Sequence, residues 1–379
     1  MMGIYIHIPF CRTKCVYCDF YSCIDVGLSE EYKQALCREL MLRSNFLSGE
    51  TVETIYIGGG TPSLFDANFY QPIFDTIYQT FSVSAQPEIT LEANPDDLTE
   101  TFLAGLTKLP VNRISIGVQS FIDSELQFMK RRHSAAQAEA AVKRCQDAGY
   151  LNISIDLMYG LPEQSLDNWR YSLQQALQTN VGHISAYHIT YEEDTPVFNL
   201  LKEKKITPLD EEKSLDMFEL LIDRLTAMGF LHYEISNFAR DGFVSRHNSA
   251  YWKGIGYLGI GASAHSCNVA TRTANIADTQ KYIAGIKANN PVMSVEHIND
   301  ETAYNEFVIT SLRTVWGLSL SVLKNVFGCE RKHYFLKQAE KYLASGLLEC
   351  ISDGDVIRLT RKGIFVSDGI MSNLLIVSS

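Results

Sequence analysis

The chain has 379 residues, 46% of them hydrophobic, and carries a formal net charge of -11 from 33 basic and 44 acidic side chains. A chain of this length can bury a large core and predicts one large domain with a smaller one beside it. The acidic excess argues against a primary role on nucleic acid, because too few cations remain to neutralise phosphates along an extended face.

The first residues, MMGIYIHIPFC, lack the basic region, apolar stretch and cleavage site of a secretory signal peptide. No apolar run reaches the length of a membrane-spanning helix. We therefore expect a cytoplasmic protein, with transient association with a membrane left open. Nine cysteines should stay reduced there, so a tight cluster favours a metal site or catalysis over disulfides. The scattered ones are expected to be buried, small hydrophobic residues: Cys37, Cys145, Cys267, Cys329 and Cys350.

Six short runs rich in β-branched residues follow one another in the first half of the chain. They lie at 4–8, 54–58, 88–92, 113–117, 153–160 and 183–190, with amphipathic stretches such as 134–150 between them. This alternation predicts a parallel sheet with right-handed crossovers. The near-continuous apolar strands predict burial on both faces. We expect an α/β fold, a partial (β/α)6 barrel of the TIM type, in preference to an open doubly wound sheet.

Polar residues stand at the end of each predicted strand. In chain order they are the cysteine loop, GGGTPS at 58–63, Glu92, Gln119, Asp156 and His188. Barrel enzymes build their sites at the carboxyl ends of the strands, where the following loops converge. Ordinary solvation explains one polar strand end, but six in series favour a binding or active site at one mouth.

Beyond about residue 200 the strand–helix alternation ends. We expect a helix around 211–229, a Gly-rich segment at 254–266 and a helical region from about 295. Residues 334–379 predict a helix, a hairpin turning at 352–355 and another helix, which resembles a winged-helix module used for packing or docking. The predicted domains are a barrel at 1–230, an extension at 231–290 and a C-terminal α+β domain at 291–379.

The clustered cysteines follow a C-x3-C-x2-C pattern at Cys11, Cys15 and Cys18. Three thiolates on one loop can hold three irons of a [4Fe–4S] cluster and leave the fourth open to a small molecule. A structural zinc site prefers four ligands, commonly two C-x2-C pairs, and the sequence has no second pair. Cys23 lies five residues further on, at a different spacing, and its role and that of His7 are left open.

This cysteine loop after a first strand, with Tyr17 before the last cysteine, resembles the radical S-adenosylmethionine (SAM) superfamily. GGGTPS resembles that superfamily's glycine motif for the methionine amino group. The resemblance implies that the open iron takes the amino and carboxylate groups of SAM, and that a reduced cluster breaks the sulfonium bond to give a 5′-deoxyadenosyl radical.

The segments YIHIPFC, GGGTPS, EANPDDL, RISIGVQSF, IDLMYGLPEQ and GASAH narrow the resemblance to oxygen-independent coproporphyrinogen III oxidase and its relatives, over nearly the whole chain. The resemblance implies that Glu92 and Asp156 suit ribose hydroxyls or the ammonium group. Arg131 suits a carboxylate, although it could equally be a solvated helix charge. The positions implied to touch SAM are Tyr5, Gly59, Gly60, Thr61, Glu92, Gln119, Arg131 and Asp156.

Two departures from the oxidase point to the HemW-type haem chaperones. Phe20 stands where the oxidase has a further cysteine, and RHNSAYW at 246–252 matches the H-N-x-x-Y-W motif of those chaperones. The resemblance implies that His247 ligates haem iron and that Asn248, Tyr251 and Trp252 shape a flat apolar pocket. Without this resemblance, His247 would be interpreted as a structural histidine, and Tyr251 and Trp252 as packed core residues.

Three functions therefore stay in competition. The first is a haem chaperone with a [4Fe–4S] cluster and SAM, whose partners would be haem, a haem-accepting protein and an electron donor, with a homodimer left open. The second is oxidative decarboxylation of coproporphyrinogen III, which Phe20 disfavours. The third is a radical SAM enzyme with another substrate, held by the C-terminal module.

Overall fold

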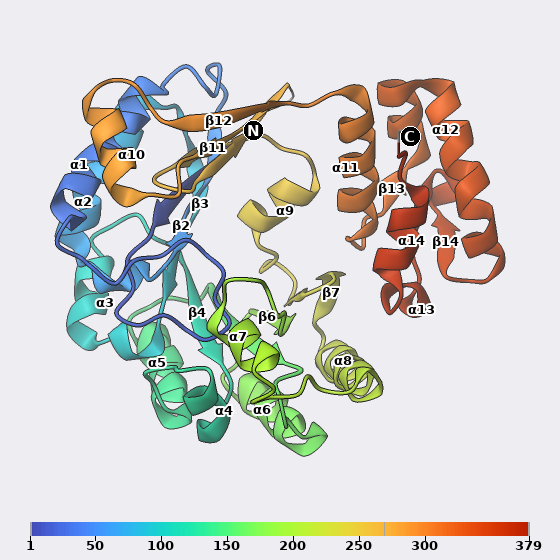
Figure 1. The fold of residues 1–379 in the computed structure, drawn as a ribbon, viewed down its shortest axis with the longest axis horizontal. Coiled ribbons are helices and arrows are strands. Elements are labelled where there is room, and N and C mark those ends of the chain that lie inside the picture. The colour runs from blue at the N-terminus through green and yellow to red at the C-terminus, as the bar shows by residue number, and fades with distance from the viewer. Residues whose placement is uncertain (1, 269, 378–379) are drawn as a thin grey trace.

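A twelve-stranded sheet organises the larger of two lobes, each with its own hydrophobic core (Figure 1). The computed structural model describes residues 2–268 and 270–377. The six predicted strands lie side by side and parallel in chain order, and the sheet has two ends, as a partial barrel requires. They are β1 (Met2–Ile8), β2 (Val52–Gly59), β3 (Val83–Ala93), β4 (Arg113–Gln119), β5 (Ile153–Tyr159) and β6 (His183–His188).

The central strands alternate in polarity. On β4, Ile114, Ile116 and Val118 point outward and are fully buried, while Arg113 and Ser115 point inward and are also buried. Burial on both faces is thus confirmed for β4, and the polar residues that interrupt its apolar run lie on the inward face. Ser115 can be polar there because its hydroxyl hydrogen-bonds to Asp156 of β5.

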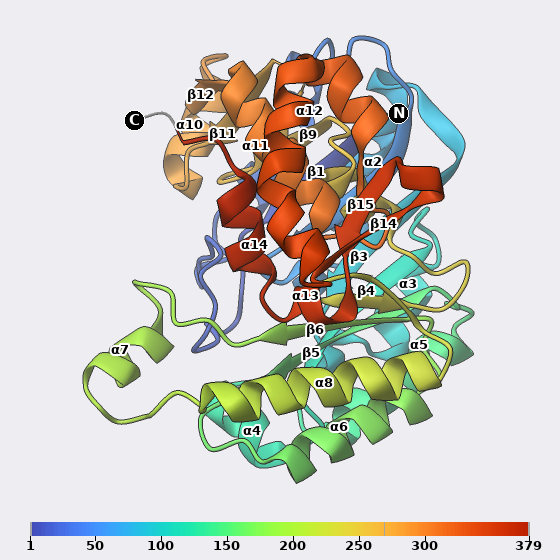
Figure 2. The same ribbon diagram turned by 90° about the vertical axis from the view of Figure 1, so that its right-hand side faces the viewer.

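Helices cover the outer face of the sheet and connect its strands (Figure 1). The helix predicted within 134–150 is α5, which begins after a capping box between Ser134 and Gln137. The outer helices are α1 (Ser29–Leu42), α2 (Ala67–Thr80), α3 (Glu100–Leu106), α4 (Asp123–Phe128), α5 (Ala135–Asp147), α6 (Leu166–Gln178) and α8 (Glu211–Ala227). Helix α7 (Pro196–Lys202) projects beyond β6, on the same side of the sheet as the cysteine loop (Figure 2).

Segment 231–297 extends the sheet at both ends. Strands β7 (Leu231–Glu234) and β8 (Asn237–Ala239) add beside β6, and β9 (Tyr257–Ile260) pairs parallel with β1. Strands β10 (His265–Cys267), β11 (Thr271–Asn275) and β12 (Met293–His297) complete the β9 side, with α10 (Thr279–Lys287) before β12. The predicted boundary at 290 separates β12 from this sheet, yet β12 pairs with β11 from Thr271 to Asn275.

The C-terminal lobe packs four helices against a three-stranded sheet in the order β13-β15-β14. Its elements are α11 (Asp300–Leu312), β13 (Leu318–Ser319), α12 (Leu320–Ala344), β14 (Leu348–Ile351), β15 (Val356–Leu359), α13 (Arg361–Ile364) and α14 (Ser367–Leu374). The hairpin turns where predicted, with Ser352 and Asp353 at a φ of 53°. Arg361 joins this lobe to α8 through an ion pair of 2.5 Å with Asp223.

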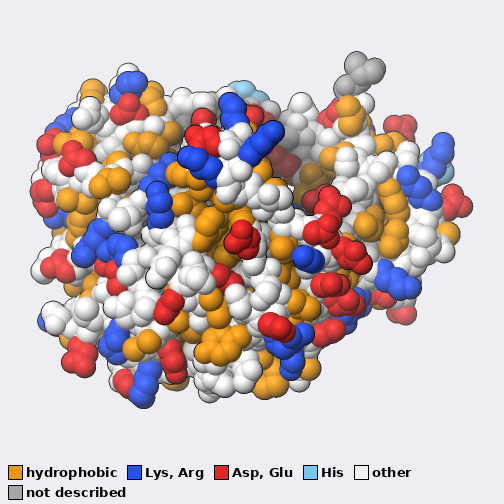
Figure 3. Space-filling view, turned by 60° about the horizontal axis from the view of Figure 1, so that its bottom comes forward, with side chains coloured by type: hydrophobic (Ala, Val, Ile, Leu, Met, Phe, Trp, Pro, Cys, Tyr) orange, Lys and Arg blue, Asp and Glu red, His pale blue; other side chains and the backbone are white. Residues whose placement is uncertain are grey.

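The prediction that the scattered cysteines are buried is confirmed only for Cys145. Cys329 and Cys350 are exposed, because they fall on the solvent side of α12 and on β14 of the small sheet. None of the described helices is both long and apolar enough to cross a membrane. Acidic side chains gather on the face of the molecule shown in Figure 3, beside the C-terminal lobe, in line with the negative net charge.

Candidate functional site

A cavity of about 450 Å³ opens at the carboxyl ends of the parallel strands. Residues from all six predicted polar strand ends line it, as expected for a barrel mouth. Ten of the eleven residues predicted for the cluster and for SAM are among its lining: Cys11, Cys15, Cys18, Gly59, Gly60, Thr61, Glu92, Gln119, Arg131 and Asp156. The exception, Tyr5, lies on β1 outside this lining.

The cysteine loop is fixed at its base by backbone hydrogen bonds. The Cys11 N–H donates to the Cys23 carbonyl at 2.9 Å, and the Cys23 N–H donates to the Pro9 carbonyl at 2.7 Å. Val16, in the middle of the loop, is buried in a small apolar cluster and accepts the Val197 N–H of α7 at 2.8 Å. Cys23 therefore closes the loop through its backbone.

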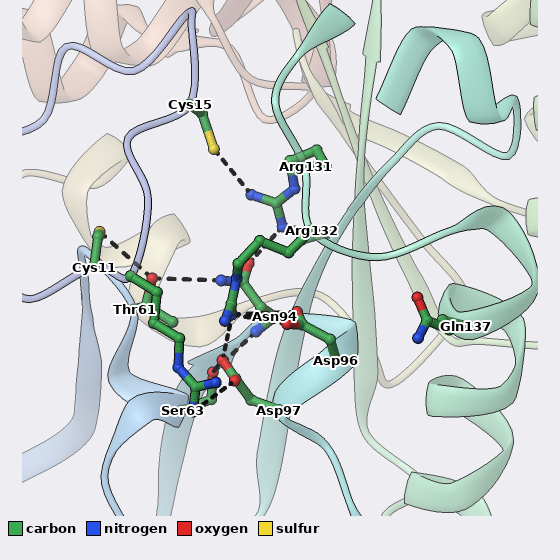
Figure 4. A network of polar contacts seen from close by, with 12 residues as sticks. Cys11, Cys15, Thr61, Ser63, Asn94, Asp96, Asp97, Arg131, Arg132 and Gln137 are labelled. Carbon is green, nitrogen blue, oxygen red and sulfur yellow. Dashed lines mark hydrogen bonds and ion pairs between the residues drawn. The ribbon is translucent and has the colours of Figure 1, made fainter. Parts of the chain in front are cut away.

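A chain of hydrogen bonds crosses the cavity wall between two of the predicted cluster cysteines (Figure 4). The Thr61 hydroxyl donates to Cys11 Sγ at 3.5 Å and accepts Asn94 Nδ2 at 3.4 Å. Arg131 Nη2 donates to Asn94 Oδ1, and Arg131 Nη1 donates to Cys15 Sγ at 3.4 Å. Donors aimed at sulfur stabilise the thiolate, which is the form that binds iron.

Without iron, burial keeps two of these thiols protonated. Burial raises the pKa of Cys11, although the hydrogen bond from the Thr61 hydroxyl opposes this rise. Burial also raises the pKa of Cys18 to about 11. Binding of iron would therefore release protons. Among the described residues, no three Cys, His, Asp or Glu side chains converge closely enough for a single metal ion. All three thiols line the same cavity, and thiolates are the ligands that iron–sulfur clusters use.

The glycine motif brings backbone to the cavity surface. Gly59 has a φ of 111°, a conformation that side-chain-bearing residues rarely adopt, and an added Cβ would lie 2.5 Å from the His7 ring. A Cβ on Gly60 would meet the Phe10 carbonyl oxygen at 2.8 Å. Exposed backbone beside three thiols suits a ligand held by main-chain groups, so the residues present fit SAM beside a cluster.

Two half-buried carboxyl groups, Glu92 and Asp156, form the floor of the cavity. Glu92 accepts the Tyr56 hydroxyl at 2.7 Å and the Gly59 N–H at 3.0 Å. Burial raises the pKa of Glu92 to about 7 and that of Asp156 to about 6. Gln119, beside them, holds a φ of 68°, a strained backbone of the kind found at functional sites. The floor can therefore accept hydrogen bonds from hydroxyl or ammonium groups near neutral pH.

Tyr5, which is half-buried, and His7, which is buried, form a support outside the cavity lining. The Tyr5 hydroxyl and His7 Nδ1 are 3.0 Å apart, and His7 Nε2 lies 2.9 Å from the Tyr21 carbonyl. Because a carbonyl only accepts, Nε2 carries the proton and Nδ1 accepts from Tyr5. His7 thus links β1, the cysteine loop and Gly59.

The motif predicted for haem lies on α9 (Arg246–Trp252), outside the cavity lining. His247 is 1% exposed, with Nδ1 at 2.8 Å from the Thr54 hydroxyl and Nε2 at 2.8 Å from the Tyr251 hydroxyl. Its ring stacks on Tyr56 with centroids 5.0 Å apart. Both nitrogens are occupied, so the imidazole has no free position for iron in this arrangement.

The other two motif residues differ in their surroundings. Asn248 is half-buried, and its N–H donates to the Ser245 hydroxyl that caps α9. Trp252 is half-buried and lies under the Arg313 guanidinium, which is 5.0 Å from its ring centroid. Since Arg313 follows α11, α9 bridges the interior of the larger lobe and the C-terminal lobe, as Figure 1 shows.

Sequence reasoning missed two residues. Asn94 connects Thr61 to Arg131, and its place two residues after Glu92, on the same face of the chain, is the signal that could have found it. Arg113 is fully buried inside the barrel, and a charge in an otherwise apolar strand could have drawn attention to it.

Comparison with known proteins covers both lobes. Residues 5–176 match the model of the Radical SAM superfamily, and residues 298–366 match the HemN C-terminal domain. The chain is 33% identical to "Heme chaperone HemW" of Mycobacterium tuberculosis (strain ATCC 25618 / H37Rv), over 98% of this chain and 94% of that protein. It is 32% identical to "Heme chaperone HemW" of Bacillus subtilis (strain 168), over 99% of both.

A solved structure shares the fold. Coproporphyrinogen III oxidase (HemN) from Escherichia coli superposes with a TM-score of 0.85 at 22% identity, covering 98% of this chain and 89% of that one. The superposition extends over both lobes, so the partial barrel and the C-terminal module occur together in that protein as well.

Proposed function

Because the chain belongs to the HemW family of haem chaperones, we propose that it binds haem and passes it to a haem-requiring protein from a radical SAM scaffold. The observation that supports the scaffold's cofactors best is the convergence of three cysteines, a glycine motif and two carboxyl groups on one cavity. A haem-accepting protein and an electron donor for the cluster complete the proposal.

In this proposal Cys11, Cys15 and Cys18 hold a [4Fe–4S] cluster, and the cavity beside them holds SAM. The exposed backbone at Gly59 and Gly60 lets the methionine end of SAM approach closely, while Glu92 and Asp156 accept hydrogen bonds from its hydroxyl or ammonium groups. Bound together, cluster and SAM supply one-electron chemistry. The chain's own contribution is to bind, orient and shield them.

The oxidase is the second candidate, because the fold of this chain matches a coproporphyrinogen III oxidase. Phe20 speaks against it. Its side chain is 63% exposed and lines the cavity at the position where the oxidase pattern has a further cysteine, so no thiol is available there. An exposed aromatic ring beside the mouth suits a surface that contacts an apolar molecule.

Iron ligation by His247 carries a structural condition. Because Thr54 and Tyr251 occupy both imidazole nitrogens, haem can reach His247 only if α9 shifts and one of these hydrogen bonds breaks. Removing the Tyr251 hydroxyl should therefore make ligation easier, whereas removing the imidazole should prevent it. This opposite response separates a ligand from a structural histidine.

The test is a haem titration of anaerobically reconstituted protein, followed through the Soret band. We expect saturation near one haem per chain in the wild type, weaker binding in His247→Ala and tighter binding in Tyr251→Phe. Saturable binding that both variants leave unchanged would reject His247 as the ligand while keeping the chaperone.

The absence of saturable haem binding in the wild type would reject the chaperone itself. Turnover of coproporphyrinogen III by the same preparation would then select the oxidase. Neither haem binding nor turnover would favour a radical SAM enzyme with a different substrate.

A further inference from the structure

Arg113 is a buried cation without a direct partner. Its side chain lies on the inner face of β4 and is 1% exposed, and Nε and Nη1 have no hydrogen-bond partner among the described residues. No ion pair involving Arg113 occurs within that part of the chain. The Thr90 hydroxyl, in register with Arg113 on β3, is likewise buried and unpartnered.

The sheet register places Arg113 between and below the two carboxyl groups of the cavity floor. Strand β4 runs between β3, which carries Glu92, and β5, which carries Asp156. Glu92 is level with Ser115, two residues after Arg113 on the same inward face. Two residues of strand correspond to a rise of about 6.6 Å, which an extended arginine side chain can span.

The other groups around Arg113 are neutral or are engaged by backbone N–H groups. His247 and His183 have both ring nitrogens occupied by hydroxyl groups, His183 by Ser154 at 2.6 Å and Tyr233 at 2.7 Å. Glu88, lower on β3, accepts the backbone N–H groups of Arg246 and His247 at 3.0 and 2.9 Å. Glu234, which like Arg113 acts on the pKa of Tyr233, accepts the Ser236 N–H at 3.1 Å. The carboxyl groups on the strands that flank β4 and on the cavity floor are Glu92 and Asp156.

A buried charge is costly unless an opposite charge compensates it. Two carboxyl groups and one guanidinium enclosed in one barrel compensate each other even without direct contact, because attraction between charges acts over several ångströms at low dielectric. We propose that Arg113 is a positioning residue, an internal counter-charge that keeps Glu92 and Asp156 ionised and able to hold SAM. The inference rests on the proposed cofactor function.

The electrostatics of the floor agree with this assignment. Burial raises the pKa of both carboxyl groups, and the positive charge of Arg113 opposes that rise in each. The remaining titratable groups facing Glu92 are the phenols of Tyr5, Tyr56, Tyr187 and Tyr251, while Asp156 also faces Arg131. Burial raises the pKa of these phenols, so they stay neutral near pH 7 and leave the carboxyl groups to titrate.

The experiment measures SAM affinity between pH 6 and 9 by calorimetry on anaerobically reconstituted wild type, Arg113→Met and Arg113→Lys. In the wild type, affinity should fall as the pH drops below about 7, because a protonated carboxyl group loses acceptor capacity. Loss of the counter-charge should raise the midpoint of this fall by one pH unit or more, which makes SAM binding to Arg113→Met at least about fivefold weaker at pH 7.

The difference in SAM affinity between the wild type and Arg113→Met should disappear by pH 9. Arg113→Lys keeps the positive charge, so its SAM affinity should follow that of the wild type at every pH. Thr90→Val is the matched control, since it removes the neighbouring unpartnered hydroxyl but no charge, and its pH profile should not shift. Equal affinities of the wild type and Arg113→Met across the whole range would overturn the inference.

A second measurement does not depend on SAM or on the folding of Arg113→Met. Infrared spectra of the wild type at pH 8, compared with Glu92→Gln and Asp156→Asn, should contain no carbonyl band of a protonated carboxyl group from either residue. Such a band would overturn the inference. If the wild type binds no SAM, the cofactor proposal fails, and this spectrum still tests whether Glu92 and Asp156 are ionised beside Arg113.

Discussion

Acidification from pH 7 to pH 5 should weaken the fold through His247. Burial, and then the charge of Arg113, lower the pKa of this imidazole to about 3 from an ordinary value of 6.5. The folded protein therefore keeps His247 neutral at pH 5, whereas the unfolded chain binds a proton there. The contribution of this neutral imidazole to the free energy of unfolding is fully present above pH 6.5. It is lost by about 1.4 kcal/mol for each pH unit below that value, which amounts to about 2 kcal/mol at pH 5.

The assay is guanidinium unfolding at pH 7, 6 and 5, followed by circular dichroism, on wild type and His247→Gln. At pH 7 the variant should be the less stable protein, because it loses the hydrogen bonds to Thr54 and Tyr251. By pH 5 the difference should shrink by about 2 kcal/mol, because glutamine takes up no proton. Other buried histidines titrate equally in both proteins and cancel.

Trp252→Phe, in the same helix, is the control. It alters packing without removing a titratable group, so its effect on stability should be equal at pH 7 and pH 5. If the difference between wild type and His247→Gln is also independent of pH, then His247 is not a buried neutral imidazole and the packing described for α9 is wrong.

Three further predictions concern the site and the junction of the lobes. Cys11→Ala should abolish iron and sulfide binding, and wild-type contents of both after reconstitution would contradict the cluster assignment. Gly59→Ala should weaken SAM binding but keep the cluster, because its Cβ collides with His7; Gly49→Ala, with a φ of 79° and open space around its Cβ, is the control for backbone strain alone. Arg361→Ala should lower the free energy of unfolding by less than about 1 kcal/mol, since its ion pair with Asp223 is half-exposed, and a larger loss by chemical denaturation would contradict this.

The sequence was sufficient to predict the frame of the larger lobe. Strand and helix signals alternate regularly along the first 190 residues, and parallel pairing follows from crossover connections. The polar strand ends are equally readable, because the carboxyl ends of parallel strands meet at one mouth. For this reason, the strand pattern alone predicts that residues as distant as Cys11 and Asp156 share one cavity.

Three features could not be read in this way, because they depend on how side chains and strands pack in three dimensions. The pattern around His247 matches a haem ligand, yet Thr54, 193 residues earlier, occupies one of its nitrogens. The motif groups Tyr5 with the cavity residues because it precedes the cysteine loop, but its hydroxyl bonds to His7 outside the cavity lining. The place of β12 depends in the same way on its pairing with β11.

The polar interior of the barrel has a consequence for how its strands tolerate substitution. Outward positions such as Ile114 and Ile116 pack against helices, where apolar residues of similar volume can replace one another at little cost. Inward positions differ: Ser115 hydrogen-bonds to Asp156 and Arg113 supplies a charge opposite to it, so an apolar replacement at either position leaves a polar or charged group uncompensated. Saturation mutagenesis of β4 should therefore give a tolerance profile that alternates with every residue, although all of these residues are equally hidden from water.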